Sequence, residues 1–194
     1  MQMKPQATKL TIQSSFRRLL IAKPLDRITV RDIVEDCDLT RNTFYYHYED
    51  IYDLFDDYLD TRMQQVLEEL PPDTRWCVAL QKTLGVVIET PQMGRHIFLS
   101  RKRDTLRQYL HRVIVTTVDR YIDRSTHGLT CAIGDRRLIS ATCANALYGL
   151  LEEWLVGPEA AQLEKNLQRV LELFEGAIRA ALEKSAGSKE ECSE

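Results

Sequence analysis

The chain has 194 residues, a formal net charge of -3, and a composition of 44% hydrophobic and 28% charged residues, which is ordinary for one or two small globular domains. Glycine (8) and proline (6) are both scarce, so helices are favoured over a turn-rich β architecture. The sequence holds neither an apolar run long enough for a membrane span nor the apolar stretch of a signal peptide, so we expect a cytoplasmic protein with no membrane partner.

The cysteines and the charge pattern further narrow the class of protein that the sequence can encode. The five cysteines are an odd number without a C-x-x-C pair, which argues against disulfides and a zinc site, and we expect no metal and no cofactor. Residues 1–48 hold eight Lys or Arg against five Asp or Glu, whereas residues 49–60 hold six acids and no base. A modestly basic N-terminal segment can face phosphates while the rest of the protein is acidic.

Two helices are predicted at the start of the chain. Apolar residues at helical spacing predict the first over residues 8–22, and Pro24 ends it by disfavouring helical geometry in the residue before it. A second helix opens at Thr29, whose hydroxyl can cap it, and Asp32 completes a capping-box pattern. Its buried stripe falls at i, i+3, i+4 and i+7, on Val30, Ile33, Val34 and Cys37.

A short third helix follows a two-residue turn, Asp38-Leu39, and begins after the cap Thr40. Leu39 and Phe44 stand in the positions of a hydrophobic staple, which fixes the angle at which the chain enters the helix. Phe44 and Tyr48 are expected to point inward. The outer faces of this helix therefore present polar and aromatic side chains, namely Arg41, Asn42, Tyr45 and Tyr46.

The remaining pattern is helical throughout. A helix with Asp50 as its cap is predicted from Ile51 to Leu70, about 30 Å long, with its apolar stripe continuing through Val66 and Leu67 to a stop at residues 71–73. Five further helices are expected over residues 74–89, 92–101, 104–127, 135–156 and 159–184. The β-prone run at 113–118 is interpreted as buried helix, because no partner strand is available.

Residues 29–48 have the layout of a helix-turn-helix, in which the second helix enters the major groove of DNA and its first residues reach base edges. Arg41 suits guanine and Asn42 suits adenine. Tyr45, Tyr46 and His47 suit phosphate or thymine-methyl contacts. The alternative is a helical hairpin whose aromatic side chains only cover a core, but Phe44 and Tyr48 already fill the inward positions.

The segment DRITVRDIVEDCDLTRNTFYYHYEDIYDLF resembles the DNA-binding segment of the tetracycline-repressor (TetR) family of bacterial regulators. The residues that meet the family pattern are Thr29, Val30, Thr40, Thr43, Phe44, Tyr45, His47 and Tyr48. The resemblance implies a homodimer, with a three-helix DNA-binding domain on a larger helical domain for ligand binding and dimerisation. The implied DNA-contacting set is Thr29, Arg31, Thr40, Arg41, Asn42, Thr43, Tyr45, Tyr46 and His47.

Two positions depart from the family pattern. Asp38 stands where the family has a glycine in the turn, but aspartate tolerates the left-handed conformation better than most residues. Ile51 stands where the family has a lysine that touches phosphate, and the neighbouring acids Glu49 and Asp50 repel phosphate. We therefore expect weaker non-specific DNA affinity than is usual in the family.

The C-terminal half carries weaker signals. The segment GLLEEWL at residues 149–155 resembles a TetR branch that includes activators of dihydroxyacetone-kinase operons. The last two helices, with small residues such as Ala141, Ala144, Ala146 and Gly149, suit a four-helix dimer interface, although their stripes could instead pack within one subunit. The histidines His96, His111 and His127 are expected to be ordinary surface residues.

A basic run at residues 101–103, continued by Arg107 and Arg112, is expected to be a solvated helix face, or else to hold an anionic effector or a partner protein.

The sequence therefore predicts an all-α protein of about nine helices: a helix-turn-helix domain over residues 6–66, a helical-bundle regulatory and dimerisation domain over 67–185, and a disordered tail over 186–194. The expected function is a repressor that binds a palindromic double-stranded DNA operator and responds to an unidentified small-molecule or protein effector. The alternative is a helix-turn-helix co-regulator that acts through a protein partner, favoured by the acids at 49–60. An enzyme is not expected, because no acid–base pair, activated nucleophile or phosphate loop is found.

Overall fold

The computed structural model describes residues 5–71, 74–125, 131–157 and 162–187, and the described chain is helical throughout. The helices are α1 (Pro5–Ala22), α2 (Val30–Asp36), α3 (Arg41–His47), α4 (Ile51–Glu69), α5 (Trp76–Thr83), α6 (Gly85–Ile88), α7 (Pro91–Phe98), α8 (Arg103–Ser125), α9 (Ile133–Val156) and α10 (Leu163–Gly187), with one 3-10 turn, η1 (Leu25–Arg27). None of these helices is both long enough and apolar enough to cross a membrane.

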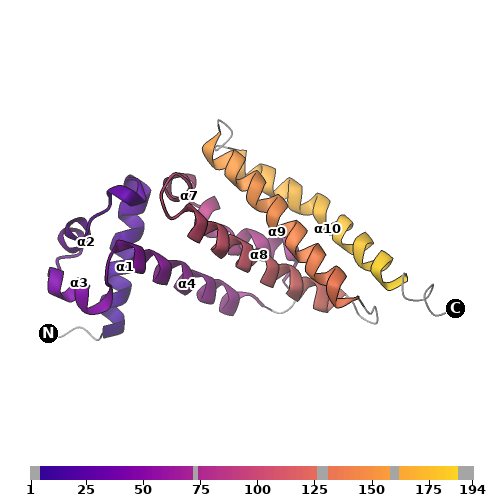
Figure 1. Ribbon diagram of the computed structural model, residues 1–194, viewed down its shortest axis with the longest axis horizontal. Helices are drawn as coiled ribbons and strands as arrows, with labels where there is room; N and C mark the ends of the chain where they lie inside the picture. The colour runs from indigo at the N-terminus through magenta and orange to yellow at the C-terminus, as the bar shows by residue number, and fades with distance from the viewer. Residues whose placement is uncertain (1–4, 72–73, 126–130, 158–161, 188–194) are drawn as a thin grey trace.

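The molecule is elongated, with α1, α2 and α3 gathered at one end and α9 and α10 lying along the opposite side (Figure 1). The helix α4 leads from the first group toward the remaining helices, α5 to α10, which we call the body, and runs beneath α8. The helix α7 packs against both α1 and α9, so it forms a second bridge between the two parts.

The N-terminal group has its own core, built from the inward stripe of α1 against α4. Phe16 is fully buried and meets the rings of Phe55 and Tyr58 edge-on, with centroids 6.4 Å and 5.7 Å away. Such edge-to-face pairs fix ring orientation as well as burying apolar area. The first half of α4 therefore belongs structurally to the N-terminal group.

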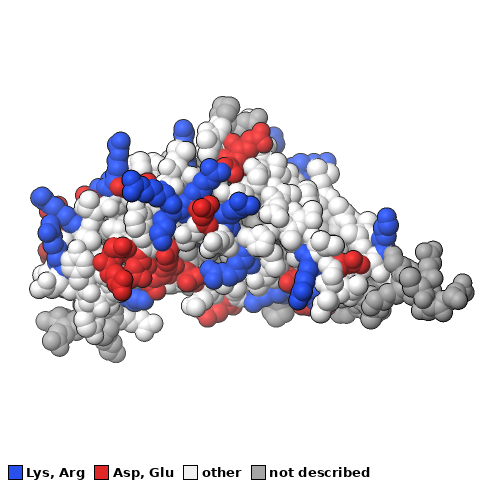
Figure 2. Space-filling view, viewed as in Figure 1, with Lys and Arg blue, Asp and Glu red and all other residues white. Residues whose placement is uncertain are grey.

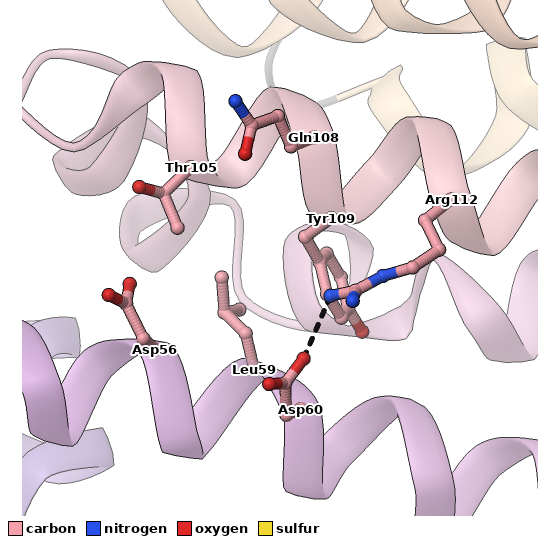
Figure 3. A pocket seen from close by; sticks show the side chains of 7 residues that line it. All are labelled: Asp56, Leu59, Asp60, Thr105, Gln108, Tyr109 and Arg112. Atoms are coloured by element: carbon pink, nitrogen blue, oxygen red, sulfur yellow. Dashed lines mark hydrogen bonds and ion pairs between the residues drawn. The ribbon is translucent and has the colours of Figure 1, made fainter.

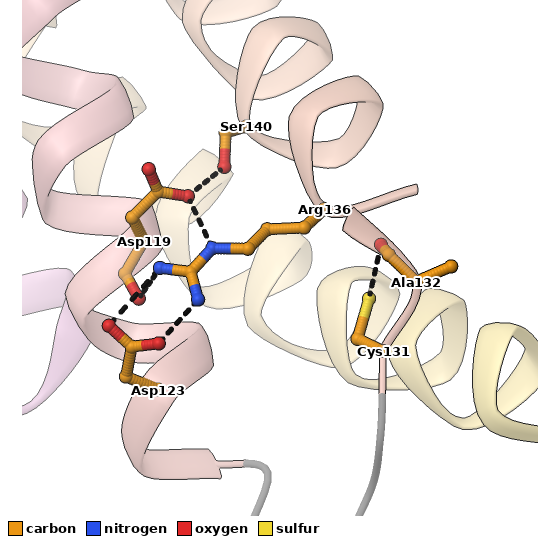
Figure 4. A network of polar contacts seen from close by, with 6 residues as sticks. All are labelled: Asp119, Asp123, Cys131, Ala132, Arg136 and Ser140. Carbon is orange, nitrogen blue, oxygen red and sulfur yellow. Dashed lines mark hydrogen bonds and ion pairs between the residues drawn. The ribbon is translucent and has the colours of Figure 1, made fainter. Parts of the chain in front are cut away.

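The body is organised around the long α8–α9 pair. Arg136 of α9 bonds to Asp119, 3.2 Å away, and to Asp123, both on α8, and the Ser140 hydroxyl also donates to Asp119, at 2.7 Å (Figure 4). On the other side, the indole of Trp76 is buried and donates to the Leu171 carbonyl of α10 at 3.1 Å. These contacts hold α5, α8, α9 and α10 in one bundle.

The all-α prediction is confirmed, with three differences in detail. The helix expected over 74–89 is divided at Leu84 into α5 and α6. The run at 113–118 is helical and largely buried, as predicted. The apolar stripe of α4 does not continue as expected, because Val66 and Leu67 are only half-buried.

The first part of the segment that was expected to be a disordered tail, residues 186–187, is helical. The helix α10 extends through Gly187, and the buried hydroxyl of Ser185 donates to Asp135 at 2.6 Å. That hydrogen bond anchors the end of α10 on the start of α9. The rest of the expected tail, 188–194, lies outside the described residues, as does His127.

Candidate nucleic-acid interface

The helix-turn-helix is built by the local signals that the sequence carries. Thr29 caps α2 in a complete capping box, with the Asp32 amide donating to the Thr29 hydroxyl at 3.2 Å and the Thr29 amide donating to the Asp32 carboxylate at 2.8 Å. Thr40 caps α3 by accepting from the Thr43 amide at 3.1 Å. Between them, Asp38 adopts a left-handed backbone with φ of 52°, so the glycine of the family turn is replaced without loss of the turn.

The Asp32 carboxylate is the electrostatic centre of this turn. The Lys23 ammonium, 2.7 Å away, and then the Thr29 donors lower the pKa of Asp32 to about 2. Because the folded-state pKa lies below the unfolded value of about 3.9, the carboxylate stabilises the folded state above pH 4 and loses this effect as pH falls toward 2.

We therefore predict that Asp32 titrates with a midpoint near pH 2 in the folded protein, as measured by carboxyl NMR. Thr29→Ala should raise this midpoint, since it removes the hydroxyl donor. Asp32→Asn should cost about 0.5–1 kcal/mol of unfolding free energy at pH 7, and less at pH 2, where about half of the native carboxylates are protonated. A midpoint near 4 in the native protein would contradict the prediction.

The third helix separates inward from outward residues as predicted. Phe44 and Tyr48 are buried, with ring centroids 5.7 Å apart. Tyr45 and Tyr46 are 56% and 78% exposed. A large aromatic side chain left in water on a short helix is available for a partner, because it contributes little to the core.

Seven of the nine candidate DNA-contacting residues are exposed, and Thr43 and His47 are half-buried. Among the described residues, the side chains of Arg41 and Asn42 have no hydrogen-bond or ion-pair partner. Arg31 differs from these two residues, because its guanidinium lies 2.6 Å from Glu35 and would have to leave that ion pair to reach DNA. Figure 2 shows Lys and Arg at the end formed by α2 and α3, and Asp and Glu gathered over the start of α4.

A polar cluster that the sequence analysis missed lies behind the third helix. Asp57 of α4 accepts from the Tyr48 hydroxyl at 2.7 Å, from Lys9 at 2.8 Å and from the Gln13 amide at 2.8 Å. Lys9 also lies over the Tyr48 ring, 5.4 Å from its centroid. The cluster ties the end of α3 to α1 and α4, so it fixes how the outward face is presented.

The protonation states in this cluster follow from its contacts. Burial alone would raise the pKa of Asp57, but the hydrogen bonds from Lys9, Tyr48 and Gln13 outweigh it and hold the pKa below its ordinary value. Burial, followed by the carboxylate of Asp57, raises the pKa of Tyr48. Tyr48 therefore stays a hydrogen-bond donor and Asp57 stays an acceptor at neutral pH.

Five of the six acids at residues 49–60 have partners within the described chain. Asp50 caps α4 by accepting from two backbone amides, and Asp53 accepts from the Glu49 amide at 3.0 Å. Asp57 belongs to the polar cluster above. Asp56 and Asp60 form ion pairs with residues of the body, and their side chains stay about half exposed. The acidic run therefore has an explanation within the fold.

The structure also places two single residues, Ile51 within the predicted apolar stripe of α4 and His96 against expectation. Ile51 is 8% exposed and lies in the core of the N-terminal group, so a lysine there could not reach phosphate without leaving the core. His96 is not an ordinary surface histidine: its Nδ1 lies 2.8 Å from the Leu20 carbonyl and so joins α7 to α1. His111 is exposed, as expected.

Comparison with known proteins agrees with this geometry. Residues 15–58 match the family model described as bacterial regulatory proteins, tetR family. A comparison with curated proteins found no significant match.

Two solved structures share the fold. The dihydroxyacetone kinase operon activator DhaS is 16% identical, with a TM-score of 0.75, and the match covers 89% of this chain and 97% of DhaS. NalD of Pseudomonas aeruginosa, the secondary repressor of the MexAB-OprM multidrug efflux pump, is 15% identical, with a TM-score of 0.57, covering 87% and 96%. At these identities the likeness extends to the fold alone.

Proposed function

The chain belongs to the tetR family of bacterial regulatory proteins, which are DNA-binding transcription regulators and not enzymes, and from this premise we propose that it works as a homodimer on a palindromic operator. The observation that carries the proposal is the exposed outer face of α3. Its arginine, asparagine and tyrosines are held outward by a buried scaffold and have few partners within the chain.

The proposed contacts are the nine residues that the family resemblance implies. Arg41 and Asn42, in the first turn of α3, would read base edges. Tyr45, Tyr46 and His47 would contact phosphates or thymine methyl groups. Thr29, Arg31, Thr40 and Thr43 would contact the backbone near the two helix starts, where free amides attract phosphate.

The proposed dimer surface is the apolar face shared by α9 and α10. Leu138 is 66% exposed, and beside it lies a groove of about 290 Å³ lined mainly by carbon atoms, including those of Phe174 and Ala177. Gly149, on the same side of α9, has open space where a Cβ would be. Ala144 is instead buried within the subunit, so only part of the small-residue pattern is available for this interface.

We choose a second copy of the chain as the occupant, because a helix-turn-helix that reads two half-sites needs a twofold partner. An interface across two long antiparallel helices also suits the four-helix arrangement.

The proposed sign of regulation is repression. Occupying an operator is sufficient to exclude other proteins from a promoter, whereas activation requires a further productive contact. The named neighbours include both an activator and a repressor, so the sign is tested directly by transcription in vitro. Added protein should lower the yield of transcript from a promoter that carries the operator, and a higher yield would overturn repression.

The partner-protein alternative rested on the acids at 49–60, and the partners that Asp56, Asp57 and Asp60 have within the chain weaken that support.

The decisive experiment is selection of bound DNA from a random pool. The expected product is a palindrome with half-sites spaced by about one helical turn, or a multiple of it. Affinity for the selected site should fall with salt, with a log–log slope set by the number of phosphate contacts. Absence of any enriched sequence would overturn the proposed function.

We predict that Arg41→Ala weakens binding to the selected operator by about 5- to 150-fold, because a lost base contact costs about 1–3 kcal/mol. The variant should also lose base preference at one position of each half-site in a repeated selection. Its melting temperature should be unchanged, since the side chain is exposed and has no partner among the described residues. Arg179→Ala, an exposed arginine of α10, is the matched control, and equal affinity of the two variants would contradict the prediction.

A further inference from the structure

Two arginines belong to the proposed DNA-contacting set, and their surroundings differ. The side chain of Arg41 is exposed and has no ion-pair partner among the described residues. The Nε of Arg31 instead donates to the Glu35 carboxylate at 2.6 Å. The side chains of this second pair are 70% and 61% exposed. DNA can therefore reach Arg31, but the charge of its guanidinium is already balanced within the chain.

The other two acids of α2 hold cations that lie outside the proposed contact set. Asp32 accepts from Lys23 at 2.7 Å, and Asp36 accepts from Arg18 at 2.5 Å. Of the three acids of α2, Glu35 is therefore the one that competes with DNA for a charged contact residue.

The acids of α4 are placed so that they do not compete for Arg31. Asp56 and Asp60 project from α4 toward α8, where Asp60 meets Arg112 (Figure 3). Asp57 is held in the polar cluster behind α3. A substitution at Glu35 consequently changes one contact and leaves these others intact.

The ion pair between Arg31 and Glu35 is weak enough to open. An exposed pair of this kind, four residues apart on one helix, is worth only about twofold in an equilibrium constant. A phosphate brought close to Arg31 can therefore take the place of the carboxylate. A phosphate that stays farther away cannot, because the attraction between charges falls with distance and is screened by salt.

We propose that Glu35 is a specificity-determining residue, which withholds Arg31 from phosphate on DNA sequences that α3 does not fit. This inference rests on the proposed function. On the operator, α3 enters the groove and brings phosphate close enough to α2 to take Arg31 from Glu35. On other sequences the ion pair stays closed, and the protein makes one phosphate contact fewer. The ion pair thus widens the difference between specific and non-specific affinity.

The test compares native protein with Glu35→Gln on the selected operator and on a random-sequence duplex of equal length, by fluorescence anisotropy over a range of salt concentrations. On the random-sequence duplex, the variant should gain one phosphate contact, which steepens the log–log salt dependence by about 0.9. At about 0.1 M salt this gain amounts to roughly eightfold tighter binding.

On the operator the expected change is smaller. Arg31 contacts DNA there already, so the variant is spared only the opening of the ion pair, and its affinity should rise about twofold with an unchanged salt slope. The ratio of specific to non-specific affinity should therefore fall about fourfold.

Glu183→Gln is the matched control. Glu183 pairs with Arg179 on α10 at the same spacing, and the two side chains are 57% and 77% exposed. This control changes the net charge by the same amount and should leave both affinities and both salt slopes at native values. Glutamine has nearly the helix propensity of glutamate, so thermal melts of both variants should match the native protein.

A second comparison separates the ion pair from general repulsion between Glu35 and DNA. The double variant Arg31→Gln/Glu35→Gln should bind the random-sequence duplex with the same salt slope as Arg31→Gln alone. A slope that steepens even without Arg31 would assign the effect to general repulsion and overturn the proposal.

Two further results would overturn the proposal while leaving the proposed function in place, since native operator binding is measured in the same series. One is an unchanged salt slope of Glu35→Gln on the random-sequence duplex, and the other is equal tightening on both duplexes. A selection that enriches no sequence would instead overturn the proposed function. The random-sequence series would then still test whether Glu35 withholds Arg31 from phosphate.

Discussion

Replacing Leu138 by glutamate is expected to convert the protein to monomers and to weaken its binding to a palindromic operator by about a hundredfold or more. Leu138 is mostly exposed in the single chain, so the substitution removes no core. In a twofold interface each substitution occurs twice, which brings two carboxylates to one apolar surface. A loss of about 3 kcal/mol of binding free energy at such a site corresponds to a decrease of roughly a hundredfold in affinity.

Sedimentation equilibrium and fluorescence anisotropy with the selected operator measure the two effects separately. The matched control is Leu99→Glu, because Leu99 is 60% exposed at the end of α7 and lies outside the proposed dimer surface. The control should remain a dimer with native affinity. A Leu138→Glu protein that is still dimeric, with unchanged operator binding, would place the interface elsewhere.

The second large effect is expected at Asp57. Asp57→Ala should lower the unfolding free energy by about 2–4 kcal/mol at pH 7, because it leaves the buried Tyr48 hydroxyl without an acceptor and removes one of the two acceptors of the Gln13 amide. Operator affinity should also fall, since the same cluster holds the end of α3 against α1. Urea denaturation measures the first effect and anisotropy the second.

The pH dependence of this effect has a definite sign. The folded-state pKa of Asp57 is lowered, so its stabilisation is present above the unfolded value of about 3.9 and is lost as pH falls through the folded value. The stability difference between native and Asp57→Ala protein should therefore shrink below about pH 4.

Asp60→Ala, three residues along the same helix, removes only an exposed ion pair and should cost about 0–1 kcal/mol. Equal losses in the two variants would show that burial of the Asp57 cluster is unimportant.

The local architecture of the helix-turn-helix could be predicted from the sequence because its signals are short-range. The caps at Thr29, Thr40 and Asp50 all form as expected, and each depends on residues within three positions of the cap. The inward placement of Phe44 and Tyr48 follows from helical periodicity alone. The DNA contacts themselves stay a prediction, since they involve a second molecule.

What could not be predicted depends on contacts between residues far apart in the chain. The partners of Asp57 lie 48 and 44 positions away, at Lys9 and Gln13, and no local pattern indicates them. The same holds for His96, whose partner is the carbonyl of Leu20. Three of the acids that favoured the partner-protein alternative, Asp56, Asp57 and Asp60, instead accept from the protein's own lysine, arginine and tyrosine side chains.

The adjacent acids Asp56 and Asp57 have a consequence for how this protein can be recombined with its relatives. Neighbours on a helix differ by about 100° in direction, and here one carboxylate binds Lys102 of the body while the next binds Lys9 of the DNA-binding group. Inserting or deleting one residue before this pair would turn the downstream helix by that angle. A chimaera that joins the DNA-binding group of one protein to the body of another within α4 must therefore keep the number of residues in α4 unchanged.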